Sequence, residues 1–89
     1  MEVVWTATAL ADIASIFGYV RRFNPHAATR LVSILRQTGD SLATFPERGR
    51  LTGAGRRELL IVRPYVIRYR IDGGRVLILR IRHGHQEPE

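Results

Sequence analysis

Arginine is the side chain in this sequence with the greatest capacity to bind a charged partner or stabilise a charged intermediate. All 14 basic residues are arginine, and the formal net charge at pH 7 is +6. Guanidinium groups stay protonated and can bind carboxylates or phosphates through two parallel hydrogen bonds. Between positions 56 and 85 arginines alternate with apolar residues, which predicts a basic sheet face for an acidic partner. The arginines assigned to this face are Arg68, Arg70, Arg80 and Arg82, with Arg57 and Arg63 as possible extensions.

Two histidines near the end of the chain are the candidates for acid–base chemistry. If His83 reaches the sheet edge beside Arg82, it can act as a general acid or base in a nuclease. The alternative is a half-buried structural histidine, because the alternation places His83 on the core side. We expect His85 to be solvated, and two alternating histidines without a nearby carboxylate do not predict a metal site. The chain has no cysteine, and we expect neither a metal ion nor a cofactor.

An amphipathic helix is predicted near the start of the chain, where it would cover the sheet. Thr6 or Thr8 can cap its first turn, and Asp12 lies close to the positive end of its dipole. Apolar residues recur behind this cap at steps of three and four, as expected for one face of a helix. The residues of that stripe are Leu10, Ile13, Phe17 and Val20.

A second amphipathic helix is predicted to follow after a tight turn. Asn24 is suited to the N-cap and Pro25 to the first helical position, and Pro46 ends the pattern. Gly39 weakens this helix locally by about 1 kcal/mol relative to alanine. Its apolar stripe contains Ala28, Leu31, Leu35, Thr38, Leu42 and Phe45. The short connection predicts that the two helices pack as an antiparallel hairpin.

The turn between the last two strands decides which side chains share a face. In a regular ladder, a two- or four-residue loop would pair Ile67 with Arg80 and turn arginines toward the core. An unpaired buried charge costs several kcal/mol, so we predict the three-residue loop 72–74, which pairs Ile67 with Leu79. This register places the four arginines of the two strands on the face opposite the helices, together with Val66, Val76 and Ile78.

The whole chain, residues 1–89, is predicted to form one α+β domain. A short strand at Glu2–Trp5 joins the main sheet, and the glycine-rich segment 47–55 is predicted to be a loop. The resulting order is β-α-α-β-β-β, a two-layer fold with a helical hairpin packed on one face of a small, mainly antiparallel sheet. No apolar run approaches the roughly 20 residues that span a bilayer, and we expect a cytoplasmic location.

Several short sequence pieces, taken in order, resemble the RelE/ParE superfamily of bacterial toxin–antitoxin toxins. The resemblance covers nearly the whole chain, although no single piece is specific. It rests on Trp5-Thr6 with Ala9 and Asp12-Ile13, Ala28 and Leu35, Leu42–Pro46 with Gly49-Arg50, Tyr65–Tyr69, and Val76–His83. The superfamily contains RelE-like toxins, which are ribosome-dependent endoribonucleases, and ParE-like toxins, which inhibit DNA gyrase.

The departures from the RelE pattern favour the ParE-like branch. RNA cleavage needs a base for the 2′-hydroxyl, an acid for the leaving oxygen and cations for the charge on the phosphorane. The segment 58–62 is apolar where the RelE pattern has basic residues, and Val66 stands where an arginine is expected after Tyr65. The resemblance therefore implies a gyrase inhibitor without catalytic residues of its own. If the chain is instead a ribonuclease, its catalytic residues would be Arg82 and His83.

The resemblance also implies the partners. A cognate antitoxin with an acidic C-terminal arm, disordered before binding, would dock on the arginines and on Val66 and Ile78. DNA gyrase is the expected target, and the ribosome with its mRNA is the alternative. A third interpretation is an inactive toxin retained as an antitoxin-binding module. No membrane partner is expected.

Overall fold

The computed structural model describes residues 1–61 and 63–84, and Val62 and His85 lie outside this part of the chain. The elements follow the order β1, α1, α2, η1, β2, β3, β4 and β5, which confirms the predicted α+β class. The bounds are β1 Glu2–Trp5, α1 Ala7–Val20, α2 Pro25–Asp40, η1 Ser41–Ala43, β2 Arg50–Gly53, β3 Arg56–Leu60, β4 Tyr65–Asp72 and β5 Arg75–His83. Neither helix in this part is long and apolar enough to cross a membrane.

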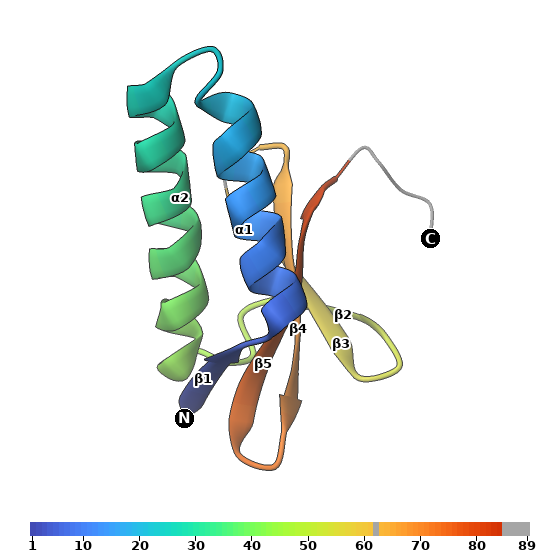
Figure 1. Cartoon of the computed structure of the whole chain (residues 1–89). Helices are drawn as coiled ribbons and strands as arrows, with labels where there is room; N and C mark the ends of the chain where they lie inside the picture. Colours follow the sequence, from blue (N-terminus) through green and yellow to red (C-terminus); the bar gives the residue numbers. More distant parts are fainter. Residues whose placement is uncertain (62, 85–89) are drawn as a thin grey trace.

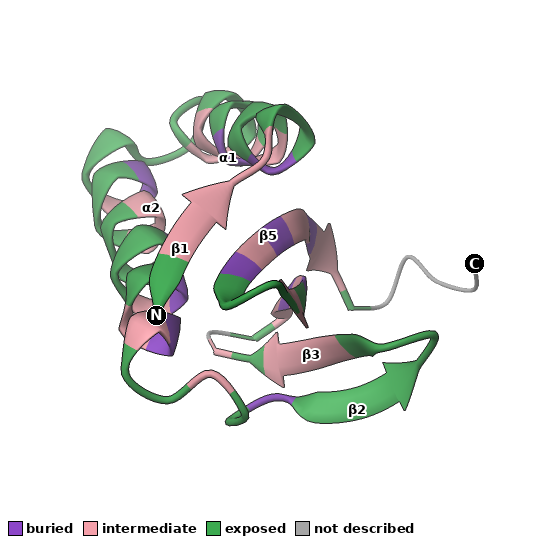
Figure 2. Ribbon diagram, turned by 90° about the horizontal axis from the view of Figure 1, so that it is seen from below, coloured by how far each residue is buried: buried purple, intermediate pink, exposed green. Residues whose placement is uncertain are grey.

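The helical hairpin of α1 and α2 lies on one face of a mixed sheet (Figures 1 and 2). The strand order is β1-β5-β4-β3-β2. β1 runs parallel to β5, and the other neighbouring strands are antiparallel. Within residues 1–61 and 63–84 no helix covers the opposite face of the sheet, so a side chain there is available for recognition unless another residue of the chain holds it.

Side-chain caps begin both helices where the sequence predicts them. Thr6, one of the two predicted caps, accepts a hydrogen bond from the Ala9 backbone N–H at 3.2 Å. Asn24 accepts from the Ala27 N–H at 3.0 Å, and Pro25 takes the first helical position. Such caps typically contribute about 1 kcal/mol each. The turn between the helices is therefore fixed at residue level by its own sequence.

The second helix ends earlier than predicted because its last turns serve a packing contact. α2 ends at Asp40, and Phe45, predicted to face the core, is 62% exposed. Gly39 is buried, and a Cβ added there would lie 2.4 Å from Cζ2 of Trp5. The Trp5 indole N–H donates to Asp40 Oδ1 at 2.9 Å. Gly39 thus admits the indole ring between β1 and α2, a role beyond the weakening expected from the sequence.

The predicted register of the β4–β5 hairpin is wrong. The loop has two residues, Gly73 and Gly74, both at positive φ, so Asp72 pairs with Arg75 and Tyr69 with Ile78. A β-bulge then shifts the register between Tyr69 and Arg68, and Ile67 pairs with Ile81. The bulge inserts one unpaired residue into β5. The bulge keeps the arginines out of the core, whereas the sequence pattern predicted that a three-residue loop would have this effect.

The corrected register changes which β5 residues are buried. Val76 and Ile78, predicted to lie among the arginines, are fully buried, and Leu77 takes their place on the open face. The buried core between the helices and the sheet consists of Ala9, Ile13, Ala28, Leu35, Leu42, Ile67, Tyr69, Val76, Ile78 and Ile81. Ile78 therefore cannot form part of a binding surface while the fold is intact.

The segment predicted to be a loop contains the edge strand β2. Arg50 pairs with Glu58 and Leu51 with Arg57, followed by a register shift before Gly53. All four residues of β2 are exposed. The sequence pattern missed this strand because alternating apolar residues mark a strand only where one face is buried.

Candidate functional site

The open sheet face, called the arginine face below, carries both cations and apolar side chains. Directly paired residues point to the same side of an antiparallel sheet, and the pairs Arg56–Arg70, Leu60–Val66 and Val66–Arg82 lie opposite the buried Ile67 and Tyr69. The face is formed by Arg50, Arg56, Glu58, Leu60, Val66, Arg68, Arg70, Leu77 and Arg82. Leu60 is 51% exposed, so the surface suits a partner with both acidic and apolar groups.

A carboxylate lies within this face, contrary to the all-cation surface that the sequence predicted. Glu58 pairs with Arg68 across the β3–β4 ladder. Arg68 donates to Glu58 Oε2 from Nε at 3.1 Å and from Nη2 at 2.8 Å. Arg50 Nη2 lies 3.8 Å from the other oxygen of Glu58. Because the side chains of Arg68 and Glu58 are only 14% and 23% exposed, this ion pair is partly shielded from water.

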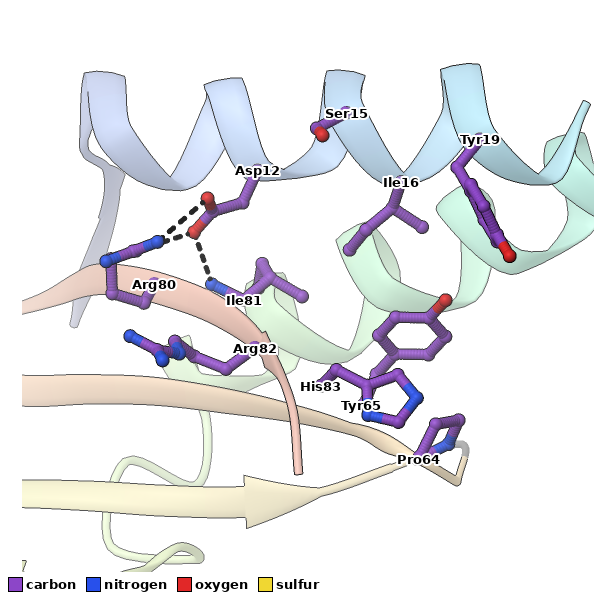
Figure 3. Close-up of a pocket in the computed structure, with 10 residues that line it drawn as sticks. All are labelled: Asp12, Ser15, Ile16, Tyr19, Pro64, Tyr65, Arg80, Ile81, Arg82 and His83. Atoms are coloured by element: carbon purple, nitrogen blue, oxygen red, sulfur yellow. Dashed lines mark hydrogen bonds and ion pairs between the residues drawn. The ribbon is translucent and has the colours of Figure 1, made fainter. Parts of the chain in front are cut away.

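Asp12 holds Arg80 beside α1. Arg80 Nε lies 2.8 Å from Asp12 Oδ2 and Nη2 lies 3.3 Å from Oδ1 (Figure 3). Asp12 Oδ2 also accepts the backbone N–H of Ile81 at 2.9 Å. β1 pairs with β5 only as far as Ile78, so Asp12 satisfies the edge of β5 beyond the end of β1. Arg80 therefore joins α1 to β5, although it pairs with Arg68 in the strand register, and its guanidinium is held by Asp12.

The two predicted extensions of the face lie elsewhere. Arg57 pairs with the buried Tyr69, and its Nη1 donates to the carbonyl oxygens of Gly49 at 2.8 Å and Glu47 at 3.2 Å. The Tyr69 hydroxyl accepts from the Gly49 N–H and donates to the Pro46 carbonyl, both at 2.7 Å. Arg57 is thus a structural residue that helps to hold the segment before β2.

Arg63 lies in the connection between β3 and β4 and is exposed. Of the arginines predicted for the face, Arg68, Arg70 and Arg82 are on it by strand register. Arg80 pairs with Arg68 on the same side, but its guanidinium binds Asp12 of α1.

A groove of about 610 Å³ opens at the end of the sheet beside α1. The residues that line it are Asp12, Ser15, Ile16, Tyr19, Pro64, Tyr65, Arg80, Ile81, Arg82 and His83 (Figure 3). His83 packs edge-to-face on Tyr65, with ring centroids 5.7 Å apart. His83 is half-buried, so it combines the packing role and the position beside Arg82 that the sequence left open.

The helix contributes groove residues that the sequence interpretation missed. The groove residues of α1 are spaced three or four positions apart, so they share one helix face. They are Asp12, Ser15, Ile16 and Tyr19. Their helical spacing could have predicted this shared face, but the prediction for α1 rested on the apolar stripe, which marks the neighbouring face. The groove offers hydrogen-bond donors and aromatic surface. Among residues 1–61 and 63–84, no three His, Asp or Glu side chains gather as a metal site requires.

Comparison with known proteins places the chain among toxins. A family model for the ParE toxin of type II toxin–antitoxin systems, parDE, matches residues 3–88. The chain is similar to Toxin RelE2 of Caulobacter vibrioides, with 54% identity over 82 residues, 92% of this chain and 93% of that protein. It is also similar to the putative toxin Y4kP of Sinorhizobium fredii, with 39% identity over 91 residues, 97% of this chain and 91% of that protein.

A solved chain from the chromosomal ParDE TA system of P. aeruginosa has the same fold. It superposes with a TM-score of 0.80 at 30% sequence identity, covering 93% of this chain and 95% of that chain. The family model matches almost the full length of the chain, and the sequence identities to the two toxins indicate the same family. The chain therefore belongs to the ParE toxin family of type II toxin–antitoxin systems.

Proposed function

We propose that this type II toxin inhibits DNA gyrase by binding it and acts without catalytic residues of its own. The relatives include proteins named for both RelE and ParDE, so the target is argued from the chain itself. The observation that carries the proposal is the state of the sheet arginines. Arg68 is bound by Glu58 and Arg80 by Asp12.

These ion pairs favour protein binding over phosphate chemistry. Stabilising a phosphorane requires cations aimed at the position where negative charge develops. A guanidinium that already donates two hydrogen bonds to a carboxylate must lose that partner before it can serve a scissile phosphate. Breaking a partly buried pair is costly because it leaves the remaining charge poorly solvated. Arg68 and Arg80 are therefore better suited to hold the fold than to catalyse cleavage.

The arginine face is the proposed docking surface for the cognate antitoxin. Arg56 and Arg70 are exposed and stand opposite each other, and the exposed apolar Leu60 lies on the same face at the other end of β3. An acidic arm that is disordered in isolation and folds on binding can cover such an extended mixed surface. Val66, Arg68 and Arg82 remain predicted antitoxin contacts at the same face, together with Arg63 in the adjoining connection.

A ribosome-dependent endoribonuclease is the second candidate function, and the groove is the observation that favours it. Arg82, His83 and Tyr65 line one wall and Tyr19 faces them from α1 (Figure 3). An imidazole and a guanidinium thus line the same groove, and acid–base cleavage of RNA uses groups of these types. On this alternative, Arg82 and His83 would be catalytic.

The test uses purified full-length toxin released from its antitoxin. We expect it to inhibit supercoiling by gyrase and to increase the amount of cleaved gyrase–DNA complex, and His83→Gln to retain this inhibition. In parallel, primer extension on ribosome-bound mRNA should show no toxin-dependent cuts. Discrete mRNA cuts lost in Arg82→Ala and His83→Gln, with gyrase unaffected, would establish the ribonuclease instead. A toxin that binds antitoxin tightly but affects neither system would be the inactive binding module.

A further inference from the structure

The turn between α1 and α2 carries a second exposed cluster of arginines and aromatic rings. We call it the helical tip and define it as Phe17, Tyr19, Arg21, Arg22 and Phe23. Phe23 is 70% exposed and Tyr19 is 60% exposed, and their rings meet edge-to-face with centroids 5.3 Å apart. Exposed aromatic side chains beside arginine are characteristic of the energetic centres of protein interfaces.

The cations of the tip lie over aromatic rings. The guanidinium carbon of Arg22 is 5.8 Å from the ring centroid of Phe23, and that of Arg21 is 5.9 Å from the centroid of Phe17. Neither arginine takes part in an ion pair among the described residues. From Ile13 to Gly39 the sequence has four arginines and no Asp or Glu. The tip therefore presents positive charge that its own helices do not neutralise.

The tip is also ordered before any partner binds. The N–H groups of Phe23 and Asn24 both donate to the Val20 carbonyl at 3.0 Å, and the Arg21 N–H donates to the Phe17 carbonyl at 3.0 Å. The Asn24 cap and Pro25 then start α2 directly. A preformed turn loses little conformational freedom on binding. This favours a surface that recognises a folded partner over one that needs remodelling.

From these observations we propose that the helical tip contacts the toxin's target protein through an acidic patch with an apolar recess for Phe23. This inference rests on the proposed function and adds the gyrase-contact surface to it. A protein partner fits better than a nucleic acid, because base stacking needs an open ring face. Here Arg22 lies over Phe23, and Tyr19 meets the same ring edge-to-face.

Most of the helical tip lies apart from the proposed antitoxin surface, and Tyr19 is the tip residue that lines the groove together with Arg82. Figure 1 shows the α1–α2 turn at one end of the helical hairpin, with the β4–β5 turn at the other end of the molecule. The arginine face lies on the far side of the sheet from both helices. Target contact and antitoxin contact should therefore respond to different substitutions.

The experiment compares wild-type toxin with the double variant Arg22→Glu/Phe23→Ala. The matched control is Arg48→Glu/Phe45→Ala, which makes the same charge change at an exposed arginine and removes a ring that is 62% exposed, outside both proposed surfaces. Three quantities are measured: inhibition of supercoiling, affinity for isolated gyrase without DNA, and affinity for the antitoxin. Circular dichroism checks the fold of each protein, and Arg22→Glu alone serves as a milder variant.

We expect the tip variant to need about 30-fold more protein or more for half-maximal inhibition, as for a hot-spot pair. Its antitoxin affinity and both activities of the control should stay within about threefold of wild type. Equal inhibition by the tip variant and the control would overturn the inference. So would a loss confined to antitoxin binding, or an unchanged affinity for isolated gyrase.

The wild-type measurement distinguishes this inference from the proposed function. If wild-type toxin does not bind or inhibit gyrase, both the proposed function and the inference fall. If wild-type toxin inhibits gyrase and the tip variant does so equally well, the inference alone falls and the proposed function stands.

Discussion

The sheet and the helical hairpin both carry arginines, but their local partners differ in kind. On the sheet, Arg68 lies against Glu58 and Arg80 against Asp12, so strand-borne charge is partly neutralised within the fold. On the hairpin, Arg22 lies over Phe23 and Arg36 over Trp5, with 4.8 Å between the Arg36 guanidinium carbon and the Trp5 ring centroid.

The difference shows that arginine content alone does not identify a binding surface. A carboxylate partner satisfies the hydrogen-bond donors of a guanidinium and cancels its charge. An aromatic ring covers one face of the guanidinium but leaves its charge in place and its donors at the edge available. The first arrangement is suited to joining elements of the fold, and the second to meeting an acidic partner.

The largest expected effect is the loss of the carboxylate that joins α1 to β5. Asp12→Ala removes the acceptor for Arg80 and for the Ile81 N–H, in a pair whose side chains are 40% and 17% exposed for Arg80 and Asp12. We expect the free energy of unfolding to fall by about 2–3 kcal/mol, measured by urea denaturation. Asp72→Ala, an exposed residue beside the β4–β5 loop, is the control. Equal stability of the two variants would show that the sheet ion pair contributes little.

A somewhat smaller effect tests the aromatic contacts of the hairpin. Gly39→Ala places a Cβ against the Trp5 ring, which must shift beneath Arg36. We expect a loss of about 1–2 kcal/mol by urea denaturation, because overpacking outweighs the gain in helix propensity. Gly18→Ala, on α1 with nothing near its added Cβ, should instead stabilise the chain slightly. A stabilised Gly39→Ala variant would show that the indole is not held tightly in this contact.

Removing the negative charge of Glu58 tests directly whether a carboxylate partner makes the sheet arginines different from those of the hairpin. Glu58→Gln keeps the side-chain shape and removes the negative charge from the arginine face. We expect a loss of about 1 kcal/mol in unfolding free energy and a steeper salt dependence of non-specific DNA binding. Fluorescence anisotropy at several salt concentrations measures the second effect. An unchanged salt slope would mean that Glu58 does not limit the charge presented by this face.

The smallest expected effect on stability is at the helical tip. Arg22→Ala removes an exposed contact between a cation and a ring, and we expect a change of less than about 0.5 kcal/mol. Thermal unfolding of Arg22→Ala and Asp12→Ala, measured side by side, compares the stability contributed by the arginine–ring contact with that of the arginine–carboxylate pair. A loss as large as that of Asp12→Ala would mean that the tip is structural and would weaken its assignment as a contact surface.

Much of the helical layer could be predicted from local sequence. Thr6, Asn24 and Pro25 begin the helices through backbone groups within a few residues, so the local sequence predicts the helix starts. The predicted helical hairpin is confirmed for the same reason. The second helix was predicted too long because its periodicity continues into η1 and Phe45, whereas packing around Trp5 ends the regular helix at Asp40.

The candidate site was less predictable because it depends on register and on distant partners. The alternation in β4 and β5 correctly indicated two strands with arginine turned away from the core. It could not reveal the two-residue loop that moves Ile78 from the predicted surface into the core, or the bulge beyond that pair. Nor could it pair Arg68 with Glu58 or Arg80 with Asp12, which lies 68 positions away in the sequence.

The sequence by itself determined the α+β class, the helix starts and the family, because caps, periodicity and short motifs depend on residues that are close together in the sequence. Only the tertiary structure decided which arginines are neutralised within the fold and which face outward. The physical reason is that charge neutralisation depends on distances of about 3 Å between groups far apart along the chain. The arrangement of helix, bulge and strand sets those distances.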